Sequence, residues 1–176
     1  MNNAYRTMRD FWLDVKNLQH KQSVPQLGEQ KICVAGVELA AEDGNGQIKH
    51  LIIAASSLGN ASVYFENNSP SGIGGFTGGA CAGEVHKKAK ALMQAAAEVA
   101  GQLPLAANLP VQNNPQQVTL FVVSAEGKIR EQQVVEQTVR DPSHNLYKFF
   151  AYTQQLLGAF RAEQEAAQKQ AQKPAK

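Results

Sequence analysis

The sequence predicts an α+β fold in which helices pack against an antiparallel sheet of about five strands. Three apolar stripes recur at helical spacing, and two pairs of β-rich runs are each joined by a tight-turn signal. Such hairpins favour antiparallel pairing, because parallel strands need a long crossover between them. We expect the order α-β-β-β-α-β-β-α in a single domain over residues 1–161, followed by a flexible tail over residues 162–176 that is rich in Ala, Gln and Lys.

The first helix is predicted over residues 3–20. Tyr5 and Trp12 belong to an apolar stripe with steps of three and four residues, which is the spacing of one helix face. Either Asn2 or Asn3 can cap the start, because an asparagine side chain accepts a backbone N–H of the first turn.

The first hairpin is predicted by an apolar run that begins at Lys31, the turn E-D-G-N-G-Q over residues 42–47, and a return run over residues 48–55. Asp-Gly and Asn-Gly tolerate the positive φ that a tight hairpin turn requires. Gly36 interrupts the first run and marks a candidate bulge. A third strand is expected over residues 61–66.

Residues 69–83 read S-P-S-G-I-G-G-F-T-G-G-A-C-A-G and hold six of the fourteen glycines of the chain. Glycine loses the most conformational freedom on folding, and it lets the backbone approach another molecule closely. We therefore expect a flexible loop that connects the third strand to the second helix and binds a partner or a ligand. The residues assigned to this loop are Gly72, Gly74, Gly75, Phe76, Thr77, Gly78 and Gly79.

The second helix is predicted over residues 82–100, and a proline-rich loop over residues 103–117 follows it. The second hairpin is predicted from runs over residues 118–123 and 129–139. The second of these runs is rich in Glu, Gln and Arg, which suits the edge of a sheet.

The third helix is predicted to begin near Asp141, which can cap it, with Pro142 at the first helical position. Its apolar stripe includes Phe149 and Phe160. From Ala162 onward the chain has no apolar anchor, and this is why the tail is expected to fray.

The net charge of +2 does not indicate a nucleic-acid partner. Lys169, Lys173 and Lys176 all lie in the tail, so the body of the chain is near neutral. Binding to DNA or RNA needs a basic footprint on a folded face, and the sequence provides none. No apolar run approaches the roughly 20 residues that span a bilayer, and the start of the chain lacks a signal-peptide pattern. We expect a cytoplasmic protein without membrane insertion.

The glycine segment also admits an alternative role as a phosphate cradle. A strand, a glycine-rich loop and a helix start can hold an anion by backbone N–H groups. However, G-I-G-G-F-T-G-G matches neither the P-loop nor the dinucleotide-binding fingerprint closely. A small-anion or nucleotide-binding protein that uses residues 72–79 is therefore the alternative hypothesis.

No catalytic residue, metal site or cofactor is predicted, so the sequence favours a protein that is not an enzyme. Cys81 and His86 lie five positions apart, about 140° around a helix, and do not face one another. The four histidines lack metal-ligand spacing. His50 is expected to be a half-buried histidine with a partner, and both cysteines are expected to be buried reduced thiols.

Four carboxylates, Glu38, Glu42, Asp43 and Glu66, surround the first hairpin. Carboxylates on turns and strand ends are usually solvated. Nothing in their spacing selects a general acid and a general base, so we expect a solvated surface.

Three segments together resemble the class I type III secretion chaperones and related effector-binding adaptors. They are Y-R-T-M-R-D-F-W over residues 5–12, L-F-V-V-S-A-E-G-K-I over residues 120–129 and D-P-S-H-N-L-Y-K-F-F-A-Y-T-Q-Q-L-L-G-A-F-R over residues 141–161. The resemblance implies a homodimer formed through the middle helix and a polypeptide client. The neutral body and the glycine segment depart from the pattern of that family.

The leading hypothesis is a non-enzymatic, dimeric binding protein of secretion-chaperone or adaptor type. It would hold a partner segment against the sheet and its helices, with the glycine loop adapting to that partner. A structural subunit of a larger assembly is a further alternative.

Overall fold

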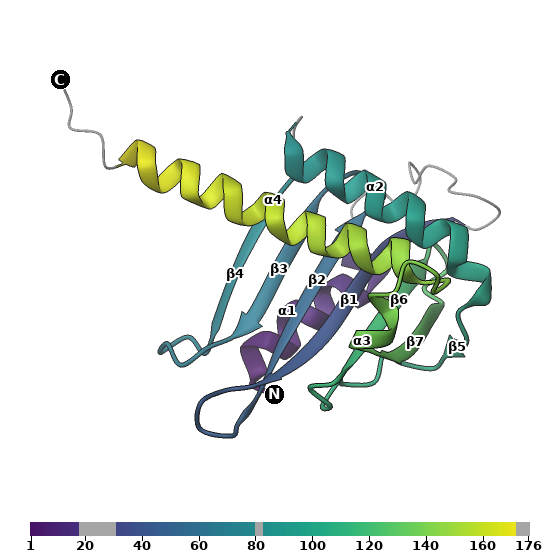
Figure 1. Cartoon of the computed structure of the whole chain (residues 1–176), viewed down its shortest axis with the longest axis horizontal. Helices are drawn as coiled ribbons and strands as arrows, with labels where there is room; N and C mark the ends of the chain where they lie inside the picture. The colour runs from purple at the N-terminus through teal and green to yellow at the C-terminus, as the bar shows by residue number, and fades with distance from the viewer. Residues whose placement is uncertain (18–30, 80–82, 172–176) are drawn as a thin grey trace.

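The computed structural model describes residues 1–17, 31–79 and 83–171, and it shows a seven-stranded antiparallel sheet with helices on both faces (Figure 1). The strand order is β4-β3-β2-β1-β6-β7-β5. Helices α2 and α4 lie side by side on one face, and α1 lies on the other (Figure 1). The predicted α+β class with an antiparallel sheet is confirmed.

The strands are β1 (Ile32–Glu42), β2 (Ile48–Ser56), β3 (Ala61–Glu66), β4 (Ile73–Gly78), β5 (Leu105–Ala106), β6 (Gln117–Ser124) and β7 (Ile129–Val135). The helices are α1 (Asn3–Leu13), α2 (Glu84–Val99), α3 (Glu136–Val139) and α4 (Tyr147–Ala171), with 3-10 turns at η1 (Val15–Asn17) and η3 (Ala100–Gln102).

The prediction of about five strands is wrong, and so is the predicted element order. The two further strands are β4, which forms within the glycine segment, and β5, which forms within the proline-rich segment. In addition, α3 follows β7 directly. Strand preference depends on packing against cross-strand neighbours more than on the residue itself. Here aromatic side chains of β3 cover the glycines of β4, so a segment with poor intrinsic strand preference becomes a strand.

Helix α1 starts as predicted, because the side chain of Asn2 accepts the backbone N–H of Tyr5 at 2.8 Å. The helix ends at Leu13, earlier than expected. The end of the predicted helix, residues 18–20, lies outside the described residues.

Helix α4 begins at Tyr147, later than predicted. Asp141 does not cap this helix; its carboxylate accepts the backbone N–H of Ser143 at 2.8 Å in a preceding turn. The helix runs to Ala171, past the domain boundary expected at residue 161, and its side chains at residues 161–169 are exposed. Figure 1 shows this part of α4 continuing beyond β4. We call residues 161–169 the α4 arm.

The sheet separates two apolar cores. Beneath α2 and α4, the core includes Ile53, Leu92, Leu120, Phe149 and Phe160. Beneath α1, the core includes Tyr5, Trp12, Val34, Ile52 and Phe121.

Gly36 is not a bulge. It pairs in register with Ala54 on β2 and with Phe121 on β6, whereas the register between β1 and β6 shifts near the start of β1. A Cβ at Gly36 would lie 2.7 Å from the ring of Phe121, so glycine is required there to admit this ring.

Candidate functional site at the β4 edge

Strand β4 lies at one end of the sheet and pairs only with β3 among the described residues. The pairing runs from Glu66 opposite Ile73 to Ala61 opposite Gly78. Five of the seven residues assigned to a flexible loop therefore belong to a strand, and Gly72 and Gly79 flank it with φ of 71° and 83°. The prediction of a loop is wrong, whereas the prediction that this segment binds a partner remains a prediction.

The hydrogen bonds of the β3–β4 hairpin determine which backbone groups of β4 are open. Asn67 donates its backbone N–H to the carbonyl oxygen of Gly72 at 3.1 Å. In an antiparallel ladder, hydrogen-bonded pairs alternate with pairs that make no hydrogen bond. The backbone N–H and C=O groups of Ile73, Gly75 and Thr77 therefore point away from β3, toward the outer side of the edge.

The two edges of the sheet differ in their protection. The outer side of β7 is partly covered by β5, and Glu131 donates its backbone N–H to the carbonyl oxygen of Pro104 at 3.0 Å. Strand β7 also carries Arg130 and Glu131. Strand β4 has neither a charged residue nor a proline. Charge, proline and covering segments are the usual means by which proteins prevent edge pairing. In the described part of the chain, β4 is the unprotected edge.

The glycines of β4 are closely packed against neighbouring side chains and backbone. A Cβ at Gly74 would lie 2.5 Å from the ring of Phe65, and one at Gly75 would lie 2.5 Å from the carbonyl oxygen of Val63. At Gly78, a Cβ would lie 3.2 Å from Phe160. These positions therefore leave little room for a side chain, and alanine at Gly74 or Gly75 would disturb the sheet itself.

An apolar strip lies beside this edge, on the face that carries α4. Leu39, Leu51 and Phe65 pair across β1, β2 and β3, and the row ends at Gly74 on β4. Phe76 lies next to this row, with its ring 6.2 Å from that of Phe65 and 6.4 Å from that of Phe160. We call these four side chains the apolar strip: Leu39, Leu51, Phe65 and Phe76. All four are only partly buried.

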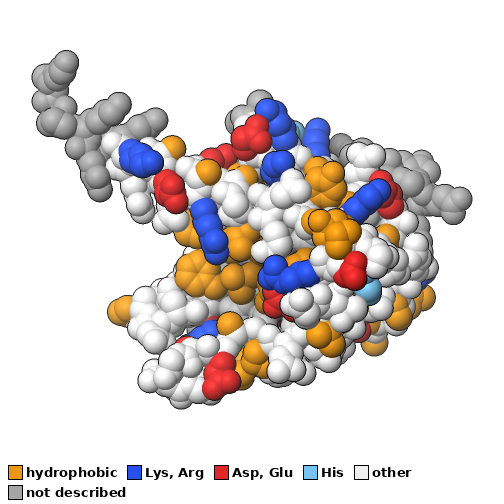
Figure 2. Space-filling view, in the orientation of Figure 1, with side chains coloured by type: hydrophobic (Ala, Val, Ile, Leu, Met, Phe, Trp, Pro, Cys, Tyr) orange, Lys and Arg blue, Asp and Glu red, His pale blue; other side chains and the backbone are white. Residues whose placement is uncertain are grey.

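Figure 2 shows hydrophobic side chains gathered in a hollow below α4, over the β3–β4 end of the sheet. The apolar strip and the open backbone of β4 are thus adjacent. An apolar patch next to an open strand edge can bind an extended polypeptide: the backbone supplies hydrogen bonds, and the patch receives side chains.

A buried polar cluster lies on the opposite face, beneath α1. Glu38 accepts hydrogen bonds from Arg9 Nε at 2.8 Å and from the Tyr5 hydroxyl at 3.1 Å, and Arg9 Nη2 also donates to the carbonyl oxygen of Leu109 at 2.7 Å. Burial raises the pKa of Tyr5, and the nearby Glu38 charge raises it further, so the phenol stays protonated. These side chains hold α1 on the sheet.

A second cluster joins the chain terminus to the sheet. The carboxylate of Glu66 accepts hydrogen bonds from the backbone of Asn2 and from the backbone and ring of His50, whose other ring nitrogen lies 3.1 Å from Asn113 Oδ1. Burial acts to raise the pKa of Glu66, but these hydrogen bonds outweigh it and lower the pKa. The prediction that His50 has a partner is confirmed, and it is more deeply buried than expected.

The prediction of solvated carboxylates is wrong for Glu38 and Glu66, which are buried. Two features of the sequence could have indicated the cluster around Glu38. Glu38 is a charged residue within an apolar strand run, and Arg9 lies four positions after Tyr5 on the buried stripe of the helix. The partner of a buried charge comes from a distant segment, so sequence spacing alone does not reveal it.

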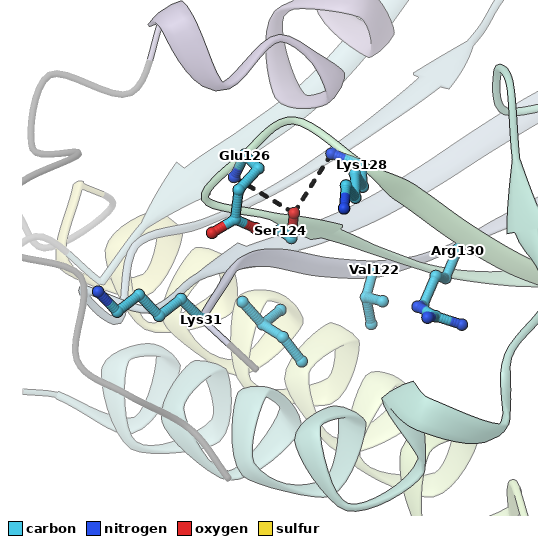
Figure 3. Close-up of a pocket in the computed structure, with 7 residues that line it drawn as sticks. Lys31, Val122, Ser124, Glu126, Lys128 and Arg130 are labelled. Atoms are coloured by element: carbon cyan, nitrogen blue, oxygen red, sulfur yellow. Dashed lines mark hydrogen bonds between the residues drawn. The ribbon is translucent and has the colours of Figure 1, made fainter. Parts of the chain in front are cut away.

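A cavity of about 360 Å³ lies where β1 begins, β6 ends and β7 begins (Figure 3). Its lining includes Lys31, Lys128 and Arg130. Figure 3 shows the Lys31 side chain extending away from Arg130, whose guanidinium donates to the carbonyl oxygen of Leu103 at 2.7 Å. Glu126 adds a negative charge, and a hydrogen bond to Ser124 lowers its pKa. These cations do not converge on one point, so the cavity is a weak candidate for an anion site.

The other predicted sites are placed as follows. Cys33 is buried, as expected, whereas Cys81 lies outside the described residues, so its relation to His86 stays open. His86 Nδ1 lies 2.8 Å from the carbonyl oxygen of Gly79. Within the described ranges, no group of three or more His, Cys, Asp or Glu side chains could hold a metal ion, and no helix is long and apolar enough to cross a membrane.

Comparison of the chain with known protein families, with curated proteins and with solved structures finds no match. Function is therefore inferred from the geometry of the β4 edge and the apolar strip.

Proposed function

We propose that this chain is a non-enzymatic protein-binding module of chaperone or adaptor type, located in the cytoplasm. It takes up an extended segment of another polypeptide along the outer side of β4. The observation that carries the proposal is the unprotected edge: Ile73, Gly75 and Thr77 turn their backbone groups outward on a strand without charge or proline. Among the described residues, only the Ile73 carbonyl oxygen has a partner there, the Ser71 hydroxyl at 3.0 Å.

The backbone pairing supplies affinity that depends little on the partner's sequence. Selectivity comes from the apolar strip, because alternate side chains of an added strand fall on the face that carries Phe76 and α4. Residues on the other face of the added strand lie beside Gly75 and Thr77, which are exposed. The favoured partner segment is therefore extended and apolar at every second position.

The alternative of an anion or nucleotide site on residues 72–79 receives less support from the geometry. An anion cradle needs several N–H groups that point at one position. The outward N–H groups of β4 belong to alternate residues of an extended strand, about 7 Å apart, and run parallel to one another.

A subunit of a larger assembly would use the same edge of β4. It would differ from an adaptor in that its partner is permanent.

The proposal is tested with a display library of random heptapeptides panned against the chain. Thr77→Pro removes an outward N–H from β4 without touching a bond to β3. Gln133→Pro is the matched control, because Glu131 N–H also points outward and Gln133 shares its orientation on β7. We expect peptides that bind the wild-type chain and the Gln133→Pro variant and lose binding to Thr77→Pro. Peptides that bind all three equally would place the binding surface elsewhere.

A further inference from the structure

We infer that β4 of a second copy of this chain occupies the β4 edge, so that two seven-stranded sheets join into one across a two-fold axis at Gly75. The inference rests on the proposed function, in that the β4 edge binds polypeptide, and it names the partner. Four observations support it: the register, the cross-strand neighbours, the α4 arm and the charge.

The hydrogen-bonding pattern selects one register. An antiparallel β4–β4 pair centred on Gly75 places Ile73 opposite the second copy's Thr77 and Gly75 opposite the second copy's Gly75. All three outward-facing residues of both copies are then hydrogen-bonded pairs. A shift in either direction leaves one of the three opposite Ser71 or Gly79, beyond the bounds of the strand. Gly72 and Gly79, both with positive φ, turn the chain away at these two ends.

The cross-strand neighbours fit this register. Gly74 of one copy lies beside the second copy's Phe76 on the face that carries α4, in a pair without hydrogen bonds, where side chains approach most closely. An aromatic ring beside an edge glycine is a favourable pairing, and Phe65 already covers Gly74 in this way within one copy. The row formed by Leu39, Leu51 and Phe65 thereby continues into the core of the second copy.

The α4 arm supplies the cover for the hollow. Helix α4 crosses β4 at Gly78, where Phe160 packs, and then continues beyond the edge (Figure 1). In the Gly75-centred register, Gly78 lies beside the second copy's Gly72, at the hairpin end of the sheet. The arm of each copy therefore passes over the end of the other sheet where the apolar strip is exposed. Nine residues of helix span about 13 Å, which reaches across two or three strands.

The charges of the two copies permit this approach. Strand β4 is uncharged, and the arm carries Arg161 and Lys169 against Glu163 and Glu165, so it is neutral overall. The surface area that strand pairing alone would bury is small compared with the roughly 1,600 Å² that a stable interface buries. The arm adds area over the apolar strip through Ala162, Ala166 and Ala167 and through the aliphatic parts of its longer side chains.

The expected dimer through the middle helix fits the structure less well. The apolar side chains of α2, including Val85, Leu92 and Met93, are buried in its own core. Its outer face carries exposed Glu84, Lys87 and other polar side chains.

A disulfide test examines the register directly. Ile73→Cys and Thr77→Cys are made separately, each in a chain in which Cys81 is alanine. Facing residues of a hydrogen-bonded pair have Cα atoms about 5.5 Å apart, which suits a disulfide. Positions 73 of two copies are offset by four residues, about 13 Å, and so are positions 77. Mixing the two variants under mild oxidation should give a disulfide-linked dimer, and each variant alone should give none. Equal cross-linking of the single variants, or none in the mixture, would overturn the register.

Light scattering on a size-exclusion column tests the dimer itself, with the same Thr77→Pro and Gln133→Pro variants. We expect dimers for the wild-type chain and Gln133→Pro, and a dissociation constant at least tenfold weaker for Thr77→Pro. A dimer that Thr77→Pro leaves unchanged would overturn the inference. A wild-type monomer that still binds library peptides at β4 would overturn it and leave the proposed function intact. A monomer without such peptides would contradict both.

Discussion

Asn67 donates its backbone N–H to the carbonyl oxygen of Gly72, and this hydrogen bond at the start of the β3–β4 hairpin sets the alternation of the whole edge. Because bonded pairs recur every second residue, Gly74, Phe76 and Gly78 bond to β3. Ile73, Gly75 and Thr77 are left facing outward. The proposed binding edge thus follows from the register of one hairpin.

The first prediction concerns the packing of Gly75. Alanine there would place its Cβ 2.5 Å from a backbone oxygen of Val63, which moves only with its strand. We expect Gly75→Ala to lower the free energy of unfolding by about 1–3 kcal/mol, as overpacking does. Gly44→Ala is the control, because a Cβ at Gly44 would meet none of the described residues within 4 Å. Urea unfolding measures both, and equal stability of the two variants would show that β4 is not packed as described.

The second prediction concerns the buried pair of Arg9 and Glu38. Glu38→Ala leaves the Arg9 guanidinium buried without its carboxylate, so we expect a loss of about 3–5 kcal/mol in the free energy of unfolding. The double change Arg9→Met with Glu38→Leu removes both charges and should recover most of the loss. If the double variant is no more stable than Glu38→Ala, the desolvated charge is not the cause.

The third prediction concerns pH. The pKa of Glu66 is lowered from 4.5 in the folded chain, since hydrogen bonds to the carboxylate outweigh the effect of burial. Its ionised form therefore contributes stability above the unfolded pKa, and this contribution is lost as the pH falls through the lower folded pKa. We expect the difference in unfolding free energy between wild type and Glu66→Gln to shrink between pH 6 and pH 3, because this range spans the ordinary glutamate pKa of 4.5. A constant difference over this range would contradict the assignment.

The fourth prediction concerns the apolar strip. Phe76→Ala removes the ring nearest the edge, and we expect roughly tenfold weaker binding of a β4-dependent peptide, which corresponds to about 1.4 kcal/mol. Leu105→Ala is the matched control, because Leu105 is 61% exposed on the strand at the opposite edge. Fluorescence anisotropy of a labelled peptide measures both. An equal effect of the two changes would remove the strip from the binding surface.

Much of the fold could be predicted from the sequence, and the failures have physical causes. Hairpin turns and apolar periodicity are local signals, so the antiparallel α+β class, the first three strands and the second hairpin follow from them. Strand β4 could not be recognised locally, because the fit of its glycines depends on Tyr64 and Phe65 of β3. The glycine content indicated an unusual backbone. The structure shows that Gly74 and Gly75 are glycines because side chains and backbone of β3 pack closely against them.

The sequence pointed to the segment that we propose as the binding edge, but not to its strand conformation. Whether Ile73, Gly75 and Thr77 face outward depends on the register with β3, which composition does not determine. The buried charges of Glu38 and Glu66 were missed for a related reason. Their partners Arg9 and Asn2 lie on a helix and terminus that only the folded chain brings to the sheet.

Amide hydrogen exchange, resolved by residue, tests the central claim most directly. The chain is measured at low concentration and again with a saturating display-selected peptide. Strand addition at β4 should slow exchange at Ile73, Gly75 and Thr77, leave the already bonded Gly74 and Phe76 little changed, and have no effect along β7. Slowed exchange elsewhere with no change at these three amides would contradict the account.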